Sequence, residues 1–356
     1  MPARLSAVIV THRHADVIAR TLEALVAQLR PDDELIVVDN DSPDGTAGAV
    51  RESAPRARVI ESGANLGFPA ACNLGAARAT GELLVFLNPD AAPAPGWREA
   101  IAAPLDEGWG WGAWQALVTC EGGARINTRG GVVHFTGIAW AGGAGEPAPP
   151  QEAGEGDARR AGTGAGDPSA EPGFVSGACL AIPRALFREL GGFAEAFFLY
   201  HEDVDLSLRV RLAGERLGVV PQARVEHDYE FEKGPAKWRY LERNRWATLL
   251  RCYPGALLAL LAPALLATEL ALVPISLAGG WWRQKLAAWV DTARSLPRLL
   301  RERRAIQSRR RAGAREFARA LTPDLDSPYL GAAARSAALR FALRAYWRAV
   351  LTALRT

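Results

Sequence analysis

The sequence predicts an α/β fold with a mostly parallel central sheet, and three observations lead to that prediction. Short apolar runs, several of them rich in β-branched residues, are expected as buried strands at 5–11, 34–38, 57–60 and 82–87. Between them, 15–29 has apolar residues at helical spacing and 69–79 is an Ala-rich helical segment. Polar residues follow the strand ends, where ligands bind in such sheets. This alternation predicts helices on both faces of the sheet.

The middle of the chain is less regular. Irregular strands and a hairpin are expected over 109–140. Segment 141–173 is almost wholly Ala, Gly, Pro, Glu and Asp, which predicts a mobile loop. A strand at 174–182 follows, then a helix opened by Pro183 and another helix at 204–213.

Composition divides the chain into an acidic body and a basic tail. Of the 356 residues, 49% are hydrophobic, enough for one large domain or two smaller ones. We expect an α/β domain at 1–235 and a helical region at 236–356. Residues 281–356 hold 17 Lys and Arg against 5 Asp and Glu, which suggests a tail facing an anionic surface. Anionic lipid and nucleic acid are both candidates from charge alone, and the family resemblance given below implies the membrane and no nucleic acid.

Four cysteines without paired spacing fit neither a zinc knuckle nor a disulfide framework, so reduced cytosolic thiols are expected. No signal peptide is expected either, because Met1 to Arg4 lead directly into a strand.

Segment 255–282 is apolar and long enough to span a bilayer, and Trp and basic residues follow it. Pro263, Glu269 and Pro274 interrupt it. Basic residues on both flanks favour keeping both flanks in the cytosol. We therefore expect a broken re-entrant or in-plane helical pair at the inner leaflet, with a buried helical hairpin as the alternative.

Polar side chains at the ends of the first two strands lie where ligands are expected to bind: Thr11, His12, Asp39 and Asp41. The carboxylate of Asp39 can accept a hydrogen bond from a ribose hydroxyl or a pyrimidine N3–H. The structural alternative for Asp39 is a helix N-cap, since Ser42 and Gly45 follow.

Two further candidates concern phosphate and metal. The turn from Asn65 to Asn73 enters a helix whose N-terminal amides can face phosphate, although such turns are common. Asp90 follows an apolar strand and offers the hard oxygen that Mg²⁺ or Mn²⁺ prefers, whereas Asn88 is a poorer ligand. An ordinary Asn-Pro-Asp turn is the alternative. His227 can add a neutral imidazole, although an isolated histidine is usually structural.

The acidic cluster at 202–205 opens a helical pattern. A carboxylate of Glu202 or Asp203 beside a sugar hydroxyl is a candidate general base. The alternative is that these acids complement the helix dipole, the role we expect for Asp205.

Taken together, these segments resemble the inverting family 2 glycosyltransferases of GT-A fold. The matching stretches occur in family order at 7–11, 36–42, 65–73, 87–91, 176–178, 191–193, 198–206 and 221–227. The Asn88-Pro89-Asp90 and Tyr200-to-Asp205 forms look most like the rhamnosyltransferase-type branch. The resemblance implies a GT-A nucleotide-diphospho-sugar transferase fold with a C-terminal helical extension that associates with the membrane.

The resemblance also implies roles for individual residues. Thr11 and Asp39 would hold the nucleoside, within a donor site that also includes His12, Asp41, Asn65, Gly67, Phe68 and Asn73. Asp90, with Asn88 and His227, would hold Mg²⁺ or Mn²⁺ on the diphosphate, and Gly177 would let the backbone approach the sugar. Asp203 would deprotonate the acceptor hydroxyl with Glu202 positioned beside it, in a single in-line displacement.

The function implied is transfer of a sugar, with dTDP-rhamnose as the first donor to test, to a glycan or lipid-linked acceptor. It would serve cell-envelope polysaccharide or glycolipid synthesis at the cytoplasmic face of the membrane. A non-catalytic sugar-nucleotide-binding or scaffold protein is the alternative. A Rossmann dehydrogenase is excluded, because 11–16 contains no glycine for its phosphate-binding turn.

Three departures from the family pattern bear on these roles. His12 stands where a Tyr is usual, Asp41 replaces a small residue, and Asn88 replaces the first Asp of Asp-x-Asp. Segment 242–246 resembles the Gln-x-x-Arg-Trp motif of processive members, but Glu242 replaces the Gln and no pore segments follow, so processivity is not expected.

Overall fold

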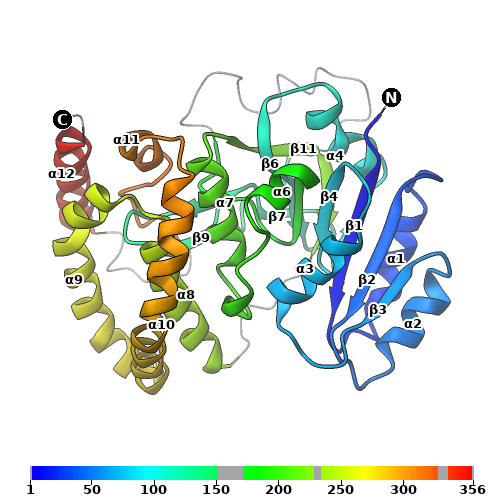
Figure 1. The fold of residues 1–356 in the computed structure, drawn as a ribbon, viewed down its shortest axis with the longest axis horizontal. Coiled ribbons are helices and arrows are strands. Elements are labelled where there is room, and N and C mark those ends of the chain that lie inside the picture. The colour runs from blue at the N-terminus through cyan, green and yellow to red at the C-terminus, as the bar shows by residue number, and fades with distance from the viewer. Residues whose placement is uncertain (1, 151–170, 228–233, 328–335, 355–356) are drawn as a thin grey trace.

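A mixed β-sheet assembled from distant parts of the chain forms the centre of the molecule (Figure 1). The computed structural model describes residues 2–150, 171–227, 234–327 and 336–354. The strand order is β3-β2-β1-β4-β10-β6-β11-β5, with β7 paired to β6. These strands are β1 (Leu5–Thr11), β2 (Glu34–Asp39), β3 (Arg58–Glu61), β4 (Leu83–Leu87), β5 (Ala92–Pro93), β6 (Trp111–Cys120), β7 (Arg125–Thr128), β10 (Cys179–Pro183) and β11 (Arg216–Glu226).

The N-terminal half of the sheet is parallel, as predicted. Strands β2 and β4 flank β1 in parallel, and the last residues of β1 and β2, Thr11 and Asp39, are register partners. All seven residues of β1 are buried. Ala7 and Ile9 belong to the core on one face of the sheet, while Val8 and Val10 belong to the core on the other face. The apolar run therefore reflects burial on both faces.

The other half makes the sheet mixed, although most of its strands run in one direction as predicted, because β6 and β11 pair in parallel. Strand β10 runs antiparallel between β4 and β6, and β5 and β7 are also antiparallel to their neighbours. The strand expected at 174–182 begins only at Cys179. Because β10 is reversed, its start lies at the edge where β1, β2 and β4 end, which brings residues 176–178 to that edge.

Helices cover both faces, as predicted. One face packs against α1 (Ile18–Val26), α2 (Thr46–Ser53) and α4 (Trp97–Asp106), and the other against α3 (Phe68–Arg78), α6 (Arg184–Glu189) and α7 (Glu202–Leu212). Helices α2 and α4 were not expected. The first buries only Thr46 and Val50, and the second contains Pro104, so neither has a clear helical pattern.

The irregular strands and hairpin expected over 109–140 are present. Besides β6 and β7, a small separate sheet pairs β8 (Gly131–Val133) with β9 (Ala139–Ala141). Most of the loop expected to be mobile, 151–170, lies outside the described residues. Its described end is anchored, because Glu171 pairs with Arg211 and Arg216 of the α/β region.

After β11 the described chain is helical. The helices are α8 (Ala236–Cys252), α9 (Gly255–Ala278), α10 (Trp282–Ser308), α11 (Ala314–Ala318) and α12 (Ala337–Ala353). They share a third core with α7 and β8, to which Leu208, Leu249, Leu257 and Trp347 contribute. Figure 1 shows α9 and α12 at the end of the molecule opposite α2.

The prediction that 255–282 forms a broken helical pair is wrong, because α9 is one continuous helix with Pro263 and Pro274 inside it. A proline removes one N–H, which leaves the carbonyl four residues earlier, that of Ala259, without its helical partner. The neighbouring carbonyl of Leu260 accepts a hydrogen bond at 2.5 Å from the Tyr346 hydroxyl of α12. Packing of Leu257, Leu261 and Leu265 holds the helix on both sides of Pro263.

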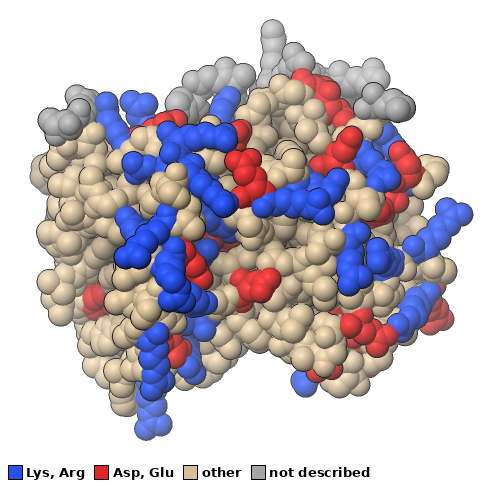
Figure 2. Space-filling view, viewed as in Figure 1, with Lys and Arg blue, Asp and Glu red and all other residues tan. Residues whose placement is uncertain are grey.

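The opposite side of α9 is apolar and exposed. Leu266, Leu270 and Leu277 are 63%, 64% and 58% exposed. Among the described residues, α9 is the one helix long and apolar enough to cross a membrane, and 17% of its most apolar stretch is buried. Figure 2 shows Lys and Arg in a band over α10, whereas the edge formed by α9 is mostly uncharged. The alternative of a buried helical hairpin therefore fits the packed side of α9 but not its exposed side.

Candidate active site

The ends of β1 and β2 form a polar pair. The Thr11 hydroxyl donates to Oδ1 of Asp39 at 3.0 Å, and the Ser42 amide donates to Oδ2 of Asp39 at 3.2 Å. Both Thr11 and Asp39 are buried. Asp39 is not an N-cap, since α2 begins after Gly45. Its carboxylate instead holds the turn after β2 and fixes where that turn lies.

The structure attaches one of the two other predicted residues near this turn, His12, and leaves the second, Asp41, exposed. The His12 ring Nδ1 lies 3.0 Å from the carbonyl oxygen of Asn40, so His12 is attached to the end of β2. Asp41 is exposed and has a left-handed backbone, with φ of 65°. Asn40 was not singled out from the sequence. It is buried, and its side chain donates to Asn65 at 3.0 Å and accepts from the Leu66 amide at 2.9 Å.

The Asn65-to-Phe68 turn contacts a distant segment of the chain. Gly67 has φ of 81°, and a Cβ there would lie 2.6 Å from the carbonyl oxygen of Phe198, so the position requires glycine. The Phe68 amide donates to that same oxygen at 2.8 Å. Asn65 accepts from the Gly67 amide at 3.0 Å and thereby shapes the turn.

Asn73 lies one turn further along α3. Its side-chain amide donates to the Phe193 carbonyl and to Glu195, both at 3.0 Å, and accepts from the Phe193 amide at 2.9 Å. These bonds hold the 193–195 segment against α3, so the structure gives the polar atoms of Asn73 structural partners.

Asp90 and His227 meet at the same edge, from the ends of β4 and β11. Asp90 Oδ1 lies 3.1 Å from His227 Nε2, and Asn88 Nδ2 lies 3.5 Å from the same ring nitrogen. Burial opposes ionisation of Asp90, but the hydrogen bond and charge of His227 hold its pKa below the usual range. The charge of His14, also missed from the sequence, acts in the same direction.

Glu202 and Asp203 open α7 as two adjacent acids, of which Glu202 is buried and Asp203 is half-buried. Asp203 accepts from the Gly177 amide at 3.1 Å and from the Val204 amide at 2.8 Å. Glu202 is buried, and its Oε2 has no hydrogen-bond partner in the described part of the chain. Burial raises the pKa of both carboxyls, and the charge of Asp203 raises that of Glu202 further.

Asp205, two residues on, is fully paired. Its carboxylate lies 2.8 Å from Arg209 and 2.6 Å from Arg251, and all three side chains are buried. Although burial opposes ionisation, these two arginines hold the pKa of Asp205 below its usual value. Asp205 is thus structural, as expected, but through buried ion pairs.

Gly177 lies between the acids and the Phe68 turn. A Cβ on Gly177 would be 3.7 Å from the Phe68 ring and 3.8 Å from Asp203 Oδ2, which are ordinary contact distances. The protein itself therefore has room for a side chain here.

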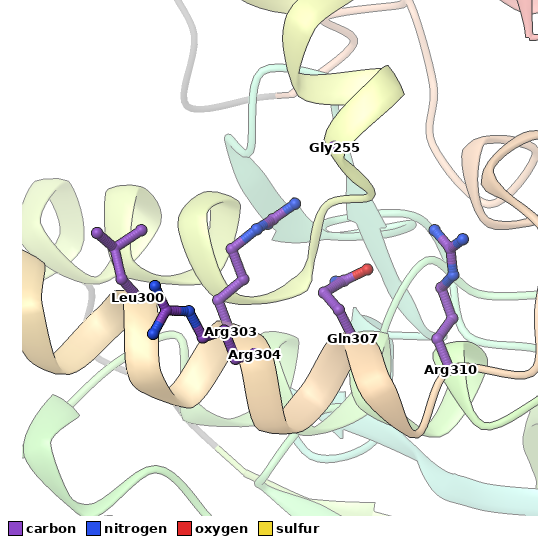
Figure 3. A pocket seen from close by; sticks show the side chains of 6 residues that line it. All are labelled: Gly255, Leu300, Arg303, Arg304, Gln307 and Arg310. Carbon is purple, nitrogen blue, oxygen red and sulfur yellow. The ribbon is translucent and has the colours of Figure 1, made fainter.

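A cavity of about 390 Å³ lies away from this edge, between the start of α9 and the C-terminal half of α10. It is lined by Gly255, Leu300, Arg303, Arg304, Gln307 and Arg310. Figure 3 shows Arg303 and Gln307 extending from α10 toward the chain at Gly255. None of the predicted donor or catalytic residues lines this cavity.

Comparison with known proteins identifies the family. Residues 6–144 match the model of "Glycosyl transferase family 2". An N-acetylglucosaminyl-diphospho-decaprenol L-rhamnosyltransferase of Mycobacterium tuberculosis is 30% identical over 270 residues, covering 69% of this chain and 83% of that protein. This chain belongs to glycosyltransferase family 2. It is therefore a glycosyltransferase, and the scaffold alternative is set aside.

A shorter match agrees with this assignment, and two solved structures show the fold. The rhamnosyltransferase WbbL of Escherichia coli is 32% identical over 83 residues, 20% of this chain and 31% of that protein. GalNAc-T7, solved with UDP, GalNAc and Mn²⁺, is 18% identical with a TM-score of 0.56, over 73% of this chain and 50% of that one. TarS 1–349 of S. aureus, solved with UDP, is 17% identical with a TM-score of 0.52, over 99% and 88%. These structures show that the glycosyltransferase has a GT-A-like fold.

Proposed function

We propose that this glycosyltransferase moves a sugar from a nucleotide-diphospho-sugar to a hydroxyl of a lipid-linked or glycan acceptor, with inversion at the anomeric carbon. One observation carries the proposal. The half-buried carboxylate of Asp203 lies against the Gly177 backbone at the sheet edge that also holds the Thr11–Asp39 and Asp90–His227 pairs. The residues that we assign to nucleoside, diphosphate and base thus share one edge of the sheet.

Asp203 is assigned as the base because the two acids differ in their surroundings. Two backbone N–H groups stabilise the ionised form of Asp203, whereas Glu202 is more buried and has an unpartnered oxygen among the described atoms. When the pair carries one proton, Glu202 therefore holds it and Asp203 holds the charge. An ionised Asp203 can accept a proton, which is what a general base requires.

The reaction then needs one displacement. The acceptor oxygen forms a bond to the anomeric carbon while its proton passes to Asp203. The bond from that carbon to the phosphate oxygen breaks, and the nucleoside diphosphate leaves with the electron pair. Attack from the side opposite the leaving group inverts the configuration. Asp203 is held by the amides of Gly177 and Val204, and we assign Glu202 to positioning beside it.

Asp39 and Thr11 are assigned to the nucleoside, with the His12, Asp41 and Asn65 segments around it. The Phe68 amide is bonded to Phe198, so Phe68 contributes its ring rather than its N–H to the donor site. Asn73 is left out, since its amide is occupied by Phe193 and Glu195.

The chemistry of Asp90, His227 and Asn88 fits a divalent cation shared with the diphosphate. The structure contains no group of three or more His, Cys, Asp or Glu suited to a metal among its described residues. A carboxylate and an imidazole are suitable ligands for Mg²⁺ or Mn²⁺, and diphosphate oxygens complete such sites. When bound, the ion neutralises charge on the leaving diphosphate. Its binding is expected to depend on the nucleotide.

The outward face of α9 supports action at the cytoplasmic side of a membrane. Leu266, Leu270 and Leu277 form an exposed apolar surface whose contact with water is unfavourable. The arginines that line the α10 cavity suit the anionic headgroups of lipids. Glu269, in the middle of α9, accepts from Lys285 at 3.0 Å, Trp246 at 3.1 Å and Trp289 at 2.8 Å. A crossing helix would have to give up these contacts, so we propose that α9 lies in the interface plane.

The experiment is a transfer assay with the full chain. dTDP-rhamnose is tested first among UDP, GDP and dTDP sugars, with an N-acetylglucosaminyl-diphospho-prenol acceptor, in Mn²⁺ or in EDTA. We expect transfer with one donor class, loss of transfer in EDTA, and an inverted anomeric configuration by NMR. A retained configuration overturns the displacement mechanism, and no transfer with any donor overturns the assigned function.

A further inference from the structure

The segment just before the catalytic acids has an unusual backbone. Phe198, Tyr200 and His201 have φ of 63°, 67° and 66°, although none is glycine. Residues other than glycine rarely adopt this left-handed backbone conformation, and they keep it only where the surrounding structure fixes it. We call residues 197–201 the catalytic turn, because Glu202 and Asp203 follow it directly.

One side chain of α8 holds three carbonyls of the catalytic turn. Asn244 Nδ2 donates to the carbonyl oxygens of Phe197 at 3.1 Å, Leu199 at 2.8 Å and Tyr200 at 2.8 Å. Asn244 is completely buried. The neighbouring Arg243 side chain makes two further hydrogen bonds. It donates to the Phe197 carbonyl at 2.6 Å and to Asn244 Oδ1 at 2.9 Å.

The other side of the catalytic turn contacts the donor region. The Phe198 carbonyl accepts the Phe68 amide, and Gly67 allows the two backbones to approach each other. Asp203 in turn depends on the Gly177 amide for its position. A shift of the catalytic turn would therefore move Phe68 and would weaken the contact between Asp203 and Gly177.

We propose that Asn244 is a positioning residue, whose amide fixes the catalytic turn so that Asp203 meets Gly177 and the acceptor. The next residue of α8, Arg245, is 2% exposed and forms ion pairs with Glu242 and with Glu269 of α9. The same turn of α8 thus contacts both the catalytic turn and the apolar helix. The kinetic part of this proposal rests on the proposed function.

The test compares three variants of the full chain. Asn244→Ala removes the donors, and Asn244→Asp keeps the shape but places a carboxylate oxygen against the three carbonyls. Gln307→Ala is the matched control. Its Nε2 donates to the carbonyls of Arg251 and Cys252 at 3.2 and 2.9 Å, at the other end of α8.

The first readout is hydrogen exchange, which needs no activity. We expect Asn244→Ala to increase exchange at least about tenfold in a peptide covering 196–204, while Gln307→Ala leaves that peptide unchanged. If Asn244→Ala and Asn244→Asp both leave this peptide as protected as in the wild type, the proposal is overturned, whether or not the protein transfers sugar.

The second readout is kinetic. We expect kcat to fall by about 10–100-fold in Asn244→Ala and at least as far in Asn244→Asp, with less than about a threefold change in nucleoside-diphosphate Kd. The acidic limb of the pH profile should move to higher pH, because loss of the Gly177 bond raises the pKa of Asp203. If kcat and the acidic limb match Gln307→Ala in both variants, the positioning role is wrong. If the wild type transfers no sugar but hydrogen exchange still increases in the Asn244 variants, the proposed function is refuted. The conclusion that Asn244 fixes the catalytic turn would still stand.

Discussion

Two acidic clusters in this protein, each with one buried and one half-buried carboxylic acid, have opposite electrostatics. At the start of α7, Glu202 and Asp203 lie together and receive only backbone N–H bonds in the described structure. Between α8, α9 and α10, Glu242 and Glu269 are paired with Arg245 and Lys285, and the Lys285–Glu242 distance is 2.7 Å. Burial disfavours ionisation in both places. In the second cluster the two cations hold the pKa of both acids below the usual range, whereas in the first both pKa values are raised.

The difference separates a reactive site from a structural one. Leaving two acids without a cation is costly for folding, and such arrangements are typical of catalytic positions. A compensated cluster instead joins helices, and its loss exposes an unpaired buried charge. The first cluster should therefore control the rate, and the second should control stability.

The largest effect is expected at Asp203. Asp203→Asn removes the proton acceptor with little change in shape, so turnover should fall by about 10²–10⁴-fold. Nucleoside-diphosphate affinity, measured by calorimetry in Mn²⁺, should stay close to that of the wild type. Turnover within a few-fold of the wild type would show that another group is the base.

The compensated cluster should respond in stability. Arg245→Met leaves Glu242 and Glu269 sharing one cation, and breaking a buried pair costs about 3–5 kcal/mol. Arg298→Met is the control, since Arg298 is 38% exposed in its side chain and lies 3.9 Å from Glu302. Such a surface pair contributes about 0–1 kcal/mol. Equal urea midpoints for the two variants would contradict the compensated role.

The outward face of the same helical region gives the third prediction. Leu270→Glu places a charge on the exposed side of α9, opposite the packed side. Burial of a leucine is worth about 1.5–3 kcal/mol, so binding to vesicles containing anionic lipid should weaken by about tenfold or more. Val26→Glu on α1, where Val26 is 43% exposed, serves as the control. Unchanged sedimentation of Leu270→Glu with the vesicles would exclude α9 as the docking surface.

How much of the fold and of the candidate site could be predicted from the sequence depends on how far apart in the chain the interacting residues lie. The strands and the residues at their ends follow from local apolar runs, and Thr11 and Asp39 did prove to be neighbours. The reversal of β10, which brings Gly177 to Asp203, depends on pairing between segments about 90 residues apart, which no local pattern encodes. Glu269 looked like an interruption of an apolar segment, because its partners Arg245 and Lys285 lie on other helices.

Asn244 shows the same limit at a single residue. Its partners are backbone carbonyls, which carry no side-chain signature, and the positive φ values of Phe198, Tyr200 and His201 are not indicated by their residue types. The continuous course of α9 depends on contacts from α12 and from the third core. Sequence patterns located the acids, while the surroundings that give the acids different roles needed the structure.

The smallest effect sharpens the electrostatic comparison itself. A carboxyl whose pKa is raised on folding binds more protons in the native state than in the unfolded state. Stability therefore falls as pH rises from the ordinary value near 4.5 toward the raised value of Glu202. The slope is at most about 1.4 kcal/mol per pH unit for one group. Glu202→Gln removes this titration and keeps the shape of the side chain. Urea unfolding at several pH values from 5 to 8 should give a flatter stability profile for Glu202→Gln than for the wild type. The control is Glu99→Gln, at an exposed position, which should leave the slope unchanged.

Parallel profiles for Glu202→Gln and the wild type would mean that Glu202 is ionised in the folded protein, and the contrast between the two clusters would fail.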